Sequence, residues 1–275
     1  MFSSMTPNTI VNLAFLGDTQ HWIIGMFFYL QVAELGRRAK GFNGTHVYNL
    51  AVLTAMGFGG GIINPIILGH DSFFPFPMGS DVVVPCICAA YLFVWITNDS
   101  ILGLPISTTP GLSHLRFLAF ELVRSKLIHG WCVKSNSIIP ASNFPSGPVF
   151  GVLVAGLVGG CGGLFLISGL SPIKDSVPWP VESAGTASLI HFLFSRSILV
   201  LPVSIASLLQ LSSTAEVAHL VVIVFLVLTR LVPTTRNFLP WRLLSKITTS
   251  AASEDKKKKK QTGQVRSDEG LKKKE

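Results

Sequence analysis

Acidic and basic side chains inside an apolar stretch are the residues of this chain best placed to do chemistry. Glu121, Arg124 and Lys126 lie close together in a segment that is otherwise mostly apolar. Residues three apart share a helix face, so Glu121 and Arg124 are expected to form an ion pair. The spacing leaves three roles open: a self-neutralising structural pair, part of an ion path, and a clamp by Arg124 and Lys126 on an anionic lipid headgroup.

Enzyme chemistry has no comparable support. The sequence contains no paired nucleophile and base, no HExxH metal motif and no phosphate-binding loop. A free thiol in an apolar segment behaves as a small hydrophobic group. The four cysteines occupy or flank such segments: Cys86, Cys88, Cys132 and Cys161. We therefore expect that the chain is not an enzyme, that it holds no metal or disulfide, and that it requires no cofactor.

The composition indicates the elements that must position these charges. The chain is 49% hydrophobic and only 13% charged, against about 25% charged residues in soluble domains. No Asp, Glu, Lys or Arg occurs between Ser135 and Ile173. This pattern predicts an all-α membrane protein that crosses the bilayer several times. The apolar segments long enough to span are 10–35, 47–69, 82–104, 110–129, 147–169, 184–210 and 215–232.

Two of these segments carry matching glycine clusters, GFGGG at 57–61 and GGCGG at 159–163. Aligned at an offset of 100, they are identical at Val52/Val152, Leu53/Leu153, Ala55/Ala155, Gly59/Gly159, Gly60/Gly160, Ile67/Ile167 and Gly69/Gly169. A Glu-Leu-x-Arg sequence precedes each cluster, starting at Glu34 and at Glu121. Spans one to three therefore recur as spans four to six. Because three spans separate the copies, we predict an inverted repeat about an axis in the membrane plane.

The glycines themselves are compatible with two roles. They allow close helix packing, or they weaken the helix and open its carbonyl groups to a cavity. Three consecutive glycines at 59–61, with Asn64 and Pro65 one turn later, predict a break in span two. The candidate pore or helix-break residues are Gly57, Gly59, Gly60, Gly61, Asn64, Pro65, Gly159, Gly160, Gly162 and Gly163.

The orientation follows from the basic tail, which contains lysines at 256–260 and 272–274. Lysine-rich segments stay on the cytosolic side, so seven spans place the N-terminus in the lumen. The final lysines fit a dilysine retrieval signal of the endoplasmic reticulum membrane, and we expect the tail to meet lipid rather than nucleic acid. The predicted organisation is a three-helix repeat over 1–104, its inverted copy over 105–210, a seventh span within 211–240 and a disordered tail over 241–275.

This combination of three plus three plus one spans, glycine-rich second and fifth helices and an acidic-basic motif in the fourth resembles the trimeric intracellular cation channels. The resemblance covers about residues 10–235. It implies a homotrimer with one pore in each subunit. It also implies potassium permeation across the endoplasmic reticulum membrane, as counter-ion flow during calcium release and uptake.

The fourth helix departs from the pattern of that family in one position. The family reads Lys-Glu-Val-x-x-Arg or similar, and its basic members bind a phosphoinositide headgroup. Here Glu121 and Arg124 match, whereas Phe120 stands where the lysine is expected, so phosphoinositide binding depends on Lys126 as a substitute. Two other functions are compatible with the same spans: an inverted-repeat secondary transporter for a small solute, and a non-conducting membrane scaffold in which the glycines only pack.

Overall fold

The computed structural model describes residues 22–40, 44–69, 83–97, 100–101, 104–105, 110–140, 148–170, 173–174, 177–202, 211, 213–232 and 234–235. The predicted tail over 241–275 lies outside these residues. The described residues up to Leu228 belong to one compact unit, and those from Thr229 belong to another.

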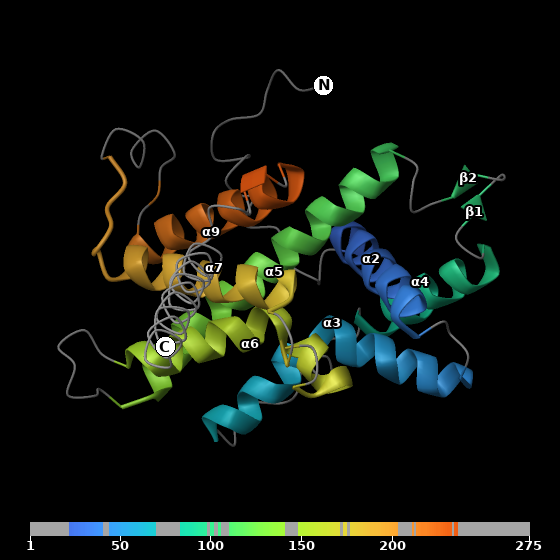
Figure 1. Cartoon of the computed structure of the whole chain (residues 1–275), viewed down its shortest axis with the longest axis horizontal. Helices are drawn as coiled ribbons and strands as arrows, with labels where there is room; N and C mark the ends of the chain where they lie inside the picture. Colours follow the sequence, from blue (N-terminus) through green and yellow to red (C-terminus); the bar gives the residue numbers. More distant parts are fainter. Residues whose placement is uncertain are drawn as a thin grey trace, which may run out of the picture. The chain divides into compact units, whose positions relative to one another are not determined.

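Seven helices make up almost all of the described part of the chain (Figure 1). They are α2 (Trp22–Lys40), α3 (His46–Leu68), α4 (Val83–Thr97), α5 (Pro110–Ile138), α6 (Val149–Ser168), α7 (Trp179–Ser195) and α9 (Thr214–Leu231). Between α4 and α5, the two-residue strands β1 (Ser100–Ile101) and β2 (Leu104–Pro105) pair antiparallel, with Ser100 opposite Pro105. By length and composition α3, α6 and α9 can cross a membrane, and α4 is a shorter apolar helix. The predicted helical membrane class is confirmed at this level.

Each predicted apolar segment overlaps one of these helices, but the ends differ. Helix α5 continues to Ile138, well past the predicted end at 129, because the polar residues there remain compatible with a helix. The hydroxyl groups of Ser135 and Ser137 donate hydrogen bonds to the carbonyls of Cys132 and Lys134, respectively. Helix α7 begins at Trp179 rather than at 184, with Pro180 in the first turn, where its missing N–H is not needed.

The predicted helix break is wrong. Helix α3 is continuous through Gly59–Gly61 and Pro65 and ends at Gly69, whose φ of 61° is left-handed. Helix α6 is likewise continuous through its glycines. Glycine keeps both backbone hydrogen-bonding groups, so the helical ladder continues, and packing offsets its weak helix propensity. Pro65 lies only one turn from the end of α3.

The core consists of two apolar clusters. The first joins α2 and α4 with parts of α3 and α5, around Phe28, Tyr29 and Phe58. The second joins α5, α6, α7 and α9, around Ile128 and Val222. Helix α6 packs extensively against α3, α5 and α7, and α3 joins the two clusters through α6. The glycine clusters lie at this central contact.

Candidate functional site: the glycine crossing and the Arg124 network

Helices α3 and α6 meet backbone to backbone at the two glycine clusters. A methyl group added to Gly60 would lie 2.6 Å from the carbonyl oxygen of Val158 and 2.8 Å from Cα of Gly159. Methyl groups at Gly59 and Gly163 would meet, respectively, the Gly163 backbone and the Met56 carbonyl, well inside van der Waals distance. Only glycine fits at these positions, so the close-packing role of the clusters is directly visible.

The second cluster serves α5 and α7 as well as α3. An added methyl group at Gly160 would lie 2.8 Å from Ile128 of α5 and 2.9 Å from Ala184 of α7. At Gly159 it would lie 3.0 Å from the Leu127 carbonyl oxygen of α5. The glycines of α6 thus bring three neighbouring helices close to one backbone.

Gly57 differs from the other glycines of α3. An added methyl group there would lie 3.7 Å from side-chain atoms of Phe28 and Val32 on α2, which is an ordinary contact. This position faces α2 rather than the α6 backbone. Gly61 and Pro65 are buried in the same helix.

Asn64 extends the crossing with a polar contact. Its Nδ2 donates a hydrogen bond of 2.9 Å to the Ala155 carbonyl oxygen on α6, and the residue has no exposed surface. Its Oδ1 has no partner among the described residues. An interhelical hydrogen bond of this kind fixes the register of two membrane helices at modest energy.

Arg124 connects three helices at the same place. From α5, its Nε donates to the Gly160 carbonyl oxygen at 2.7 Å, and its Nη2 donates to the carbonyl of Pro180 and, at 2.7 Å, to Oγ of Ser183. Its Nη1 lies 3.2 Å from Oε2 of Glu121, and both side chains are only 4% exposed. The predicted ion pair is therefore present, buried and hydrogen-bonded, as a charge in such a site must be.

The corresponding motif in α2 is built differently. Glu34 is buried and lies 3.3 Å from Nε of Arg37 and 2.5 Å from Nε of Arg38. These two arginines are 28% and 57% exposed, whereas Arg124 is almost fully enclosed. Both copies thus contain the i to i+3 ion pair, and in the second copy the arginine also donates hydrogen bonds to α6 and α7.

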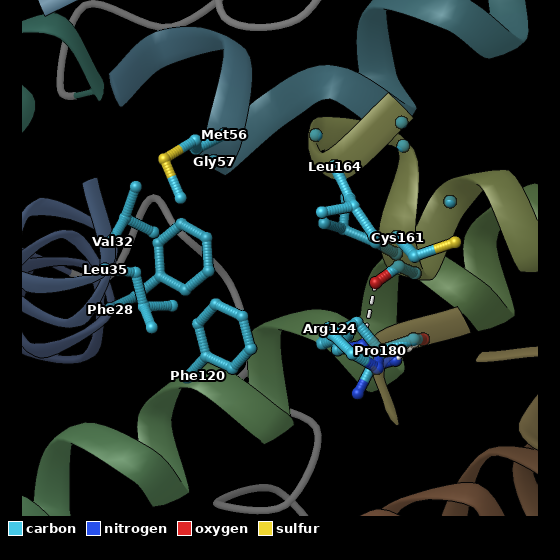
Figure 2. Close-up of a pocket in the computed structure, with 16 residues that line it drawn as sticks. Phe28, Val32, Leu35, Met56, Gly57, Phe120, Arg124, Cys161, Leu164 and Pro180 are labelled. Carbon is cyan, nitrogen blue, oxygen red and sulfur yellow. Dashed lines mark hydrogen bonds between the residues drawn. The ribbon is translucent and has the colours of Figure 1, made fainter. Parts of the chain in front are cut away.

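A cavity of about 250 Å³ lies beside the crossing. Figure 2 shows Phe28, Val32 and Phe120 on one side, with Arg124 directed towards α6 on the other. The rings of Phe28 and Phe120 stack at 5.6 Å. Glycine backbone from both clusters completes the wall: Gly57, Gly60, Gly159, Gly160, Gly162 and Gly163. Arg124 is the only charged side chain among the lining residues of this cavity.

The structure does not bring Lys126 to this cavity. Two residues from Arg124, it lies on another side of α5 and is half-buried. Its charge is close enough to act on His129 and His219. Of the three predicted charged residues, the structure therefore gathers Glu121 and Arg124 at the crossing and separates Lys126 from them.

Sequence reasoning did not predict that three histidines meet in a cluster. His129 Nδ1 lies 2.9 Å from Nε2 of His191, and the ring of His129 stacks on that of His219 at 4.4 Å. These residues come from α5, α7 and α9. Histidines within three separate apolar helices were the available signal, but nothing in their spacing joined them.

The all-helical architecture of the described residues, with three helices long and apolar enough to cross a bilayer, indicates a helical membrane protein. Compared with protein-family models, curated proteins and solved structures, the chain has no match in any of the three.

Proposed function

We propose that this protein is a potassium-permeable channel of the endoplasmic reticulum membrane, which supplies counter-ion flow during calcium release and uptake. The observation that carries the proposal is the crossing of α3 and α6, where two matched glycine clusters line a cavity beside a buried ion pair. A cavity with a buried ion pair between membrane helices is more typical of a permeation pathway than of an enzyme active site.

The helix contacts support the predicted inverted repeat. Helices α2 and α5 occupy corresponding places in the two copies and contact each other, as do α3 and α6. Within each copy, the first helix contacts the second and the third. A two-fold axis in the membrane plane would produce these contacts and would place the glycine crossing on the axis.

The ion path uses the glycine backbone. Potassium leaves water only where oxygen atoms replace its hydration shell. The cavity wall is otherwise apolar, so the backbone carbonyl groups of its glycines are the oxygens available for this, and Arg124 already donates to the one at Gly160. The lining is apolar and Arg124 holds the Gly160 carbonyl, so the cavity in this conformation offers a cation little compensation for its lost hydration shell and corresponds to a closed channel.

Opening then requires movement of Arg124. Its hydrogen bonds hold the Gly160 carbonyl of α6 to the N-terminal part of α7, at Pro180 and Ser183. Release of these bonds withdraws the positive charge and frees one glycine carbonyl. Because protein acceptors already occupy the guanidinium, a phosphoinositide headgroup cannot bind Arg124 while the network is closed. Lipid binding would therefore depend on Lys126.

Planar-bilayer recording of the purified full-length protein under asymmetric KCl tests the proposal. We expect unitary current steps with a reversal potential that favours K⁺ over Cl⁻. Solute flux without unitary steps would instead identify a secondary transporter, and silence at all voltages and lipid compositions would identify a scaffold. Lipid prepared without protein is the control.

The remaining parts of the proposal have separate tests. Cross-linking in native membranes should give a homotrimer. With the C-terminus cytosolic, the glycosylation acceptor Asn43-Gly44-Thr45 faces the cytosol and should stay unmodified. A glycan at Asn43 would overturn the orientation. Replacing Lys272 and Lys273 by serine should release the protein from the endoplasmic reticulum.

A further inference from the structure

A second cavity, of about 190 Å³, lies away from the glycine crossing. It is bounded by the C-terminal ends of α5 and α7 and the N-terminal ends of α6 and α9. Its polar lining residues are Asn136, His191, Ser195, Arg196 and Thr214. None of the residues assigned to the proposed ion path lines it, so it needs an explanation of its own.

His191 brings an unpaired nitrogen to this cavity. The residue is 2% exposed, and its Nε2 lies 2.9 Å from Nδ1 of His129. Its Nδ1 has no partner among the described residues. A buried imidazole nitrogen without a hydrogen bond is costly, which indicates a ligand or water at this position. Because Nε2 is already engaged by His129, Nδ1 is the nitrogen that remains for an occupant of the cavity.

The contacts among the three histidines bear on which ring nitrogen of His191 carries the proton. His129 stacks on His219 with an interplanar angle of 12°. Nε2 of His219 lies 3.4 Å from Oγ of Ser125, whose hydroxyl proton goes to the Leu122 carbonyl. Nε2 of His219 is therefore the donor in that contact. With Nδ1 of His129 as the donor to Nε2 of His191, neutral His191 carries its proton on Nδ1 and donates into the cavity.

Arg196 supplies the charge. It is the C-cap residue of α7, and its Nη2 donates to Oδ1 of Asn136. That bond is the only polar contact of its side chain within the described residues, and no carboxylate pairs with it there. A guanidinium carries five N–H donors in a planar fork that matches a carboxylate or phosphate. Most of this donor capacity is thus available at the cavity.

The third contribution is the N-terminus of α9, at Thr214, where the helix dipole is positive. The acidic residue of that first turn, Glu216, is held in a reciprocal cap. Its Oε2 accepts from the backbone N–H of Ser213, and its own N–H donates to Oγ of Ser213, both at 3.2 Å. This cap ties Glu216 to the start of its own helix.

We propose that this cavity is a binding site for a small oxyanion, with a carboxylate or phosphate group bound by Arg196 and by Nδ1–H of His191. The cavity has room for such a group together with a few water molecules. The proposed site does not depend on ion conduction, so binding measurements alone test it.

Calorimetric titration of the purified full-length protein with inorganic phosphate and with acetate tests this inference. We expect saturable binding of at least one of these anions at one site per chain. Arg196→Gln should weaken it by about tenfold or more, because it removes charged hydrogen bonds. Lys134→Gln is the matched control: Lys134 is an exposed cation on α5 that does not line the cavity, and binding should be unchanged.

His191→Phe should weaken binding as well, while His191→Asn, which keeps an N–H near the Nδ1 position, should retain part of it. Thermal unfolding establishes that each variant is folded. No saturable binding by the wild-type protein would overturn the proposal. Equal losses in Arg196→Gln and Lys134→Gln would also overturn it, since they would indicate general charge attraction.

Discussion

Two alanine substitutions in α3, three residues apart, should differ clearly in their effect on stability. In Gly60→Ala the new methyl group would lie 2.6 Å from the Val158 carbonyl oxygen and 2.7 Å from that of Gly159. In Gly57→Ala it would lie 3.7 Å from side chains of α2. Both changes add the same atoms to the same helix, so the difference between them isolates the crossing with α6.

The magnitude follows from these distances. An ordinary contact begins at 3.4 Å, so Gly60→Ala requires α3 and α6 to separate by about 0.8 Å. A gap of that size forfeits roughly a quarter to a half of the dispersion energy of each contact across the interface. Overpacking of this kind costs about 1–3 kcal/mol, against a gain of up to about 1 kcal/mol from replacing glycine in a helix.

We therefore expect Gly60→Ala to lower the free energy of unfolding by about 1–2 kcal/mol. Gly57→Ala should leave it unchanged or raise it slightly. Reversible unfolding in mixed detergent micelles, followed by circular dichroism, measures both. If Gly60→Ala proves as stable as Gly57→Ala, the backbone-to-backbone crossing is not the feature that holds α3 against α6.

Three further substitutions test the polar contacts by the same unfolding assay. Arg124→Gln leaves Glu121 as an unpaired buried charge and should cost about 3–5 kcal/mol, whereas adding Glu121→Gln to it should recover most of the loss. Asn64→Leu removes the bond to Ala155 and should cost about 0.6–1.7 kcal/mol; no change would mean that this bond does not hold the helices in register. Glu34→Gln should cost only about 1 kcal/mol or less, because its arginine partners reach water. A loss as large as that of Arg124→Gln would contradict the contrast between the two motifs.

The sequence predicted the helices well because their signal is local. Each predicted apolar segment overlaps a helix, and the i to i+3 spacing correctly predicted the pair of Glu121 and Arg124. It failed at the glycines, where low helix propensity suggested a break at 59–61. The compensating contact comes from α6, about a hundred residues away, and no local pattern contains it.

The same reason limits the prediction of the sites. Arg124 was singled out, but its acceptors at Gly160 and Pro180 are carbonyl groups, which any residue has. The contact of His129 with His191, likewise, depends on how α5 packs against α7. Residue types show which charged or aromatic side chains need a partner, but the partner depends on how the helices pack.

The central claim is that the cavity beside the glycine crossing is part of an ion path, and Gly57→Leu tests it most directly. Gly57 lines this cavity and faces α2, so a larger side chain fills the space without separating α3 from α6. We predict that the purified variant elutes as the wild-type assembly does and loses most of its K⁺ current in planar bilayers. Unchanged unitary conductance in a folded Gly57→Leu protein would contradict the assignment of this cavity to the path.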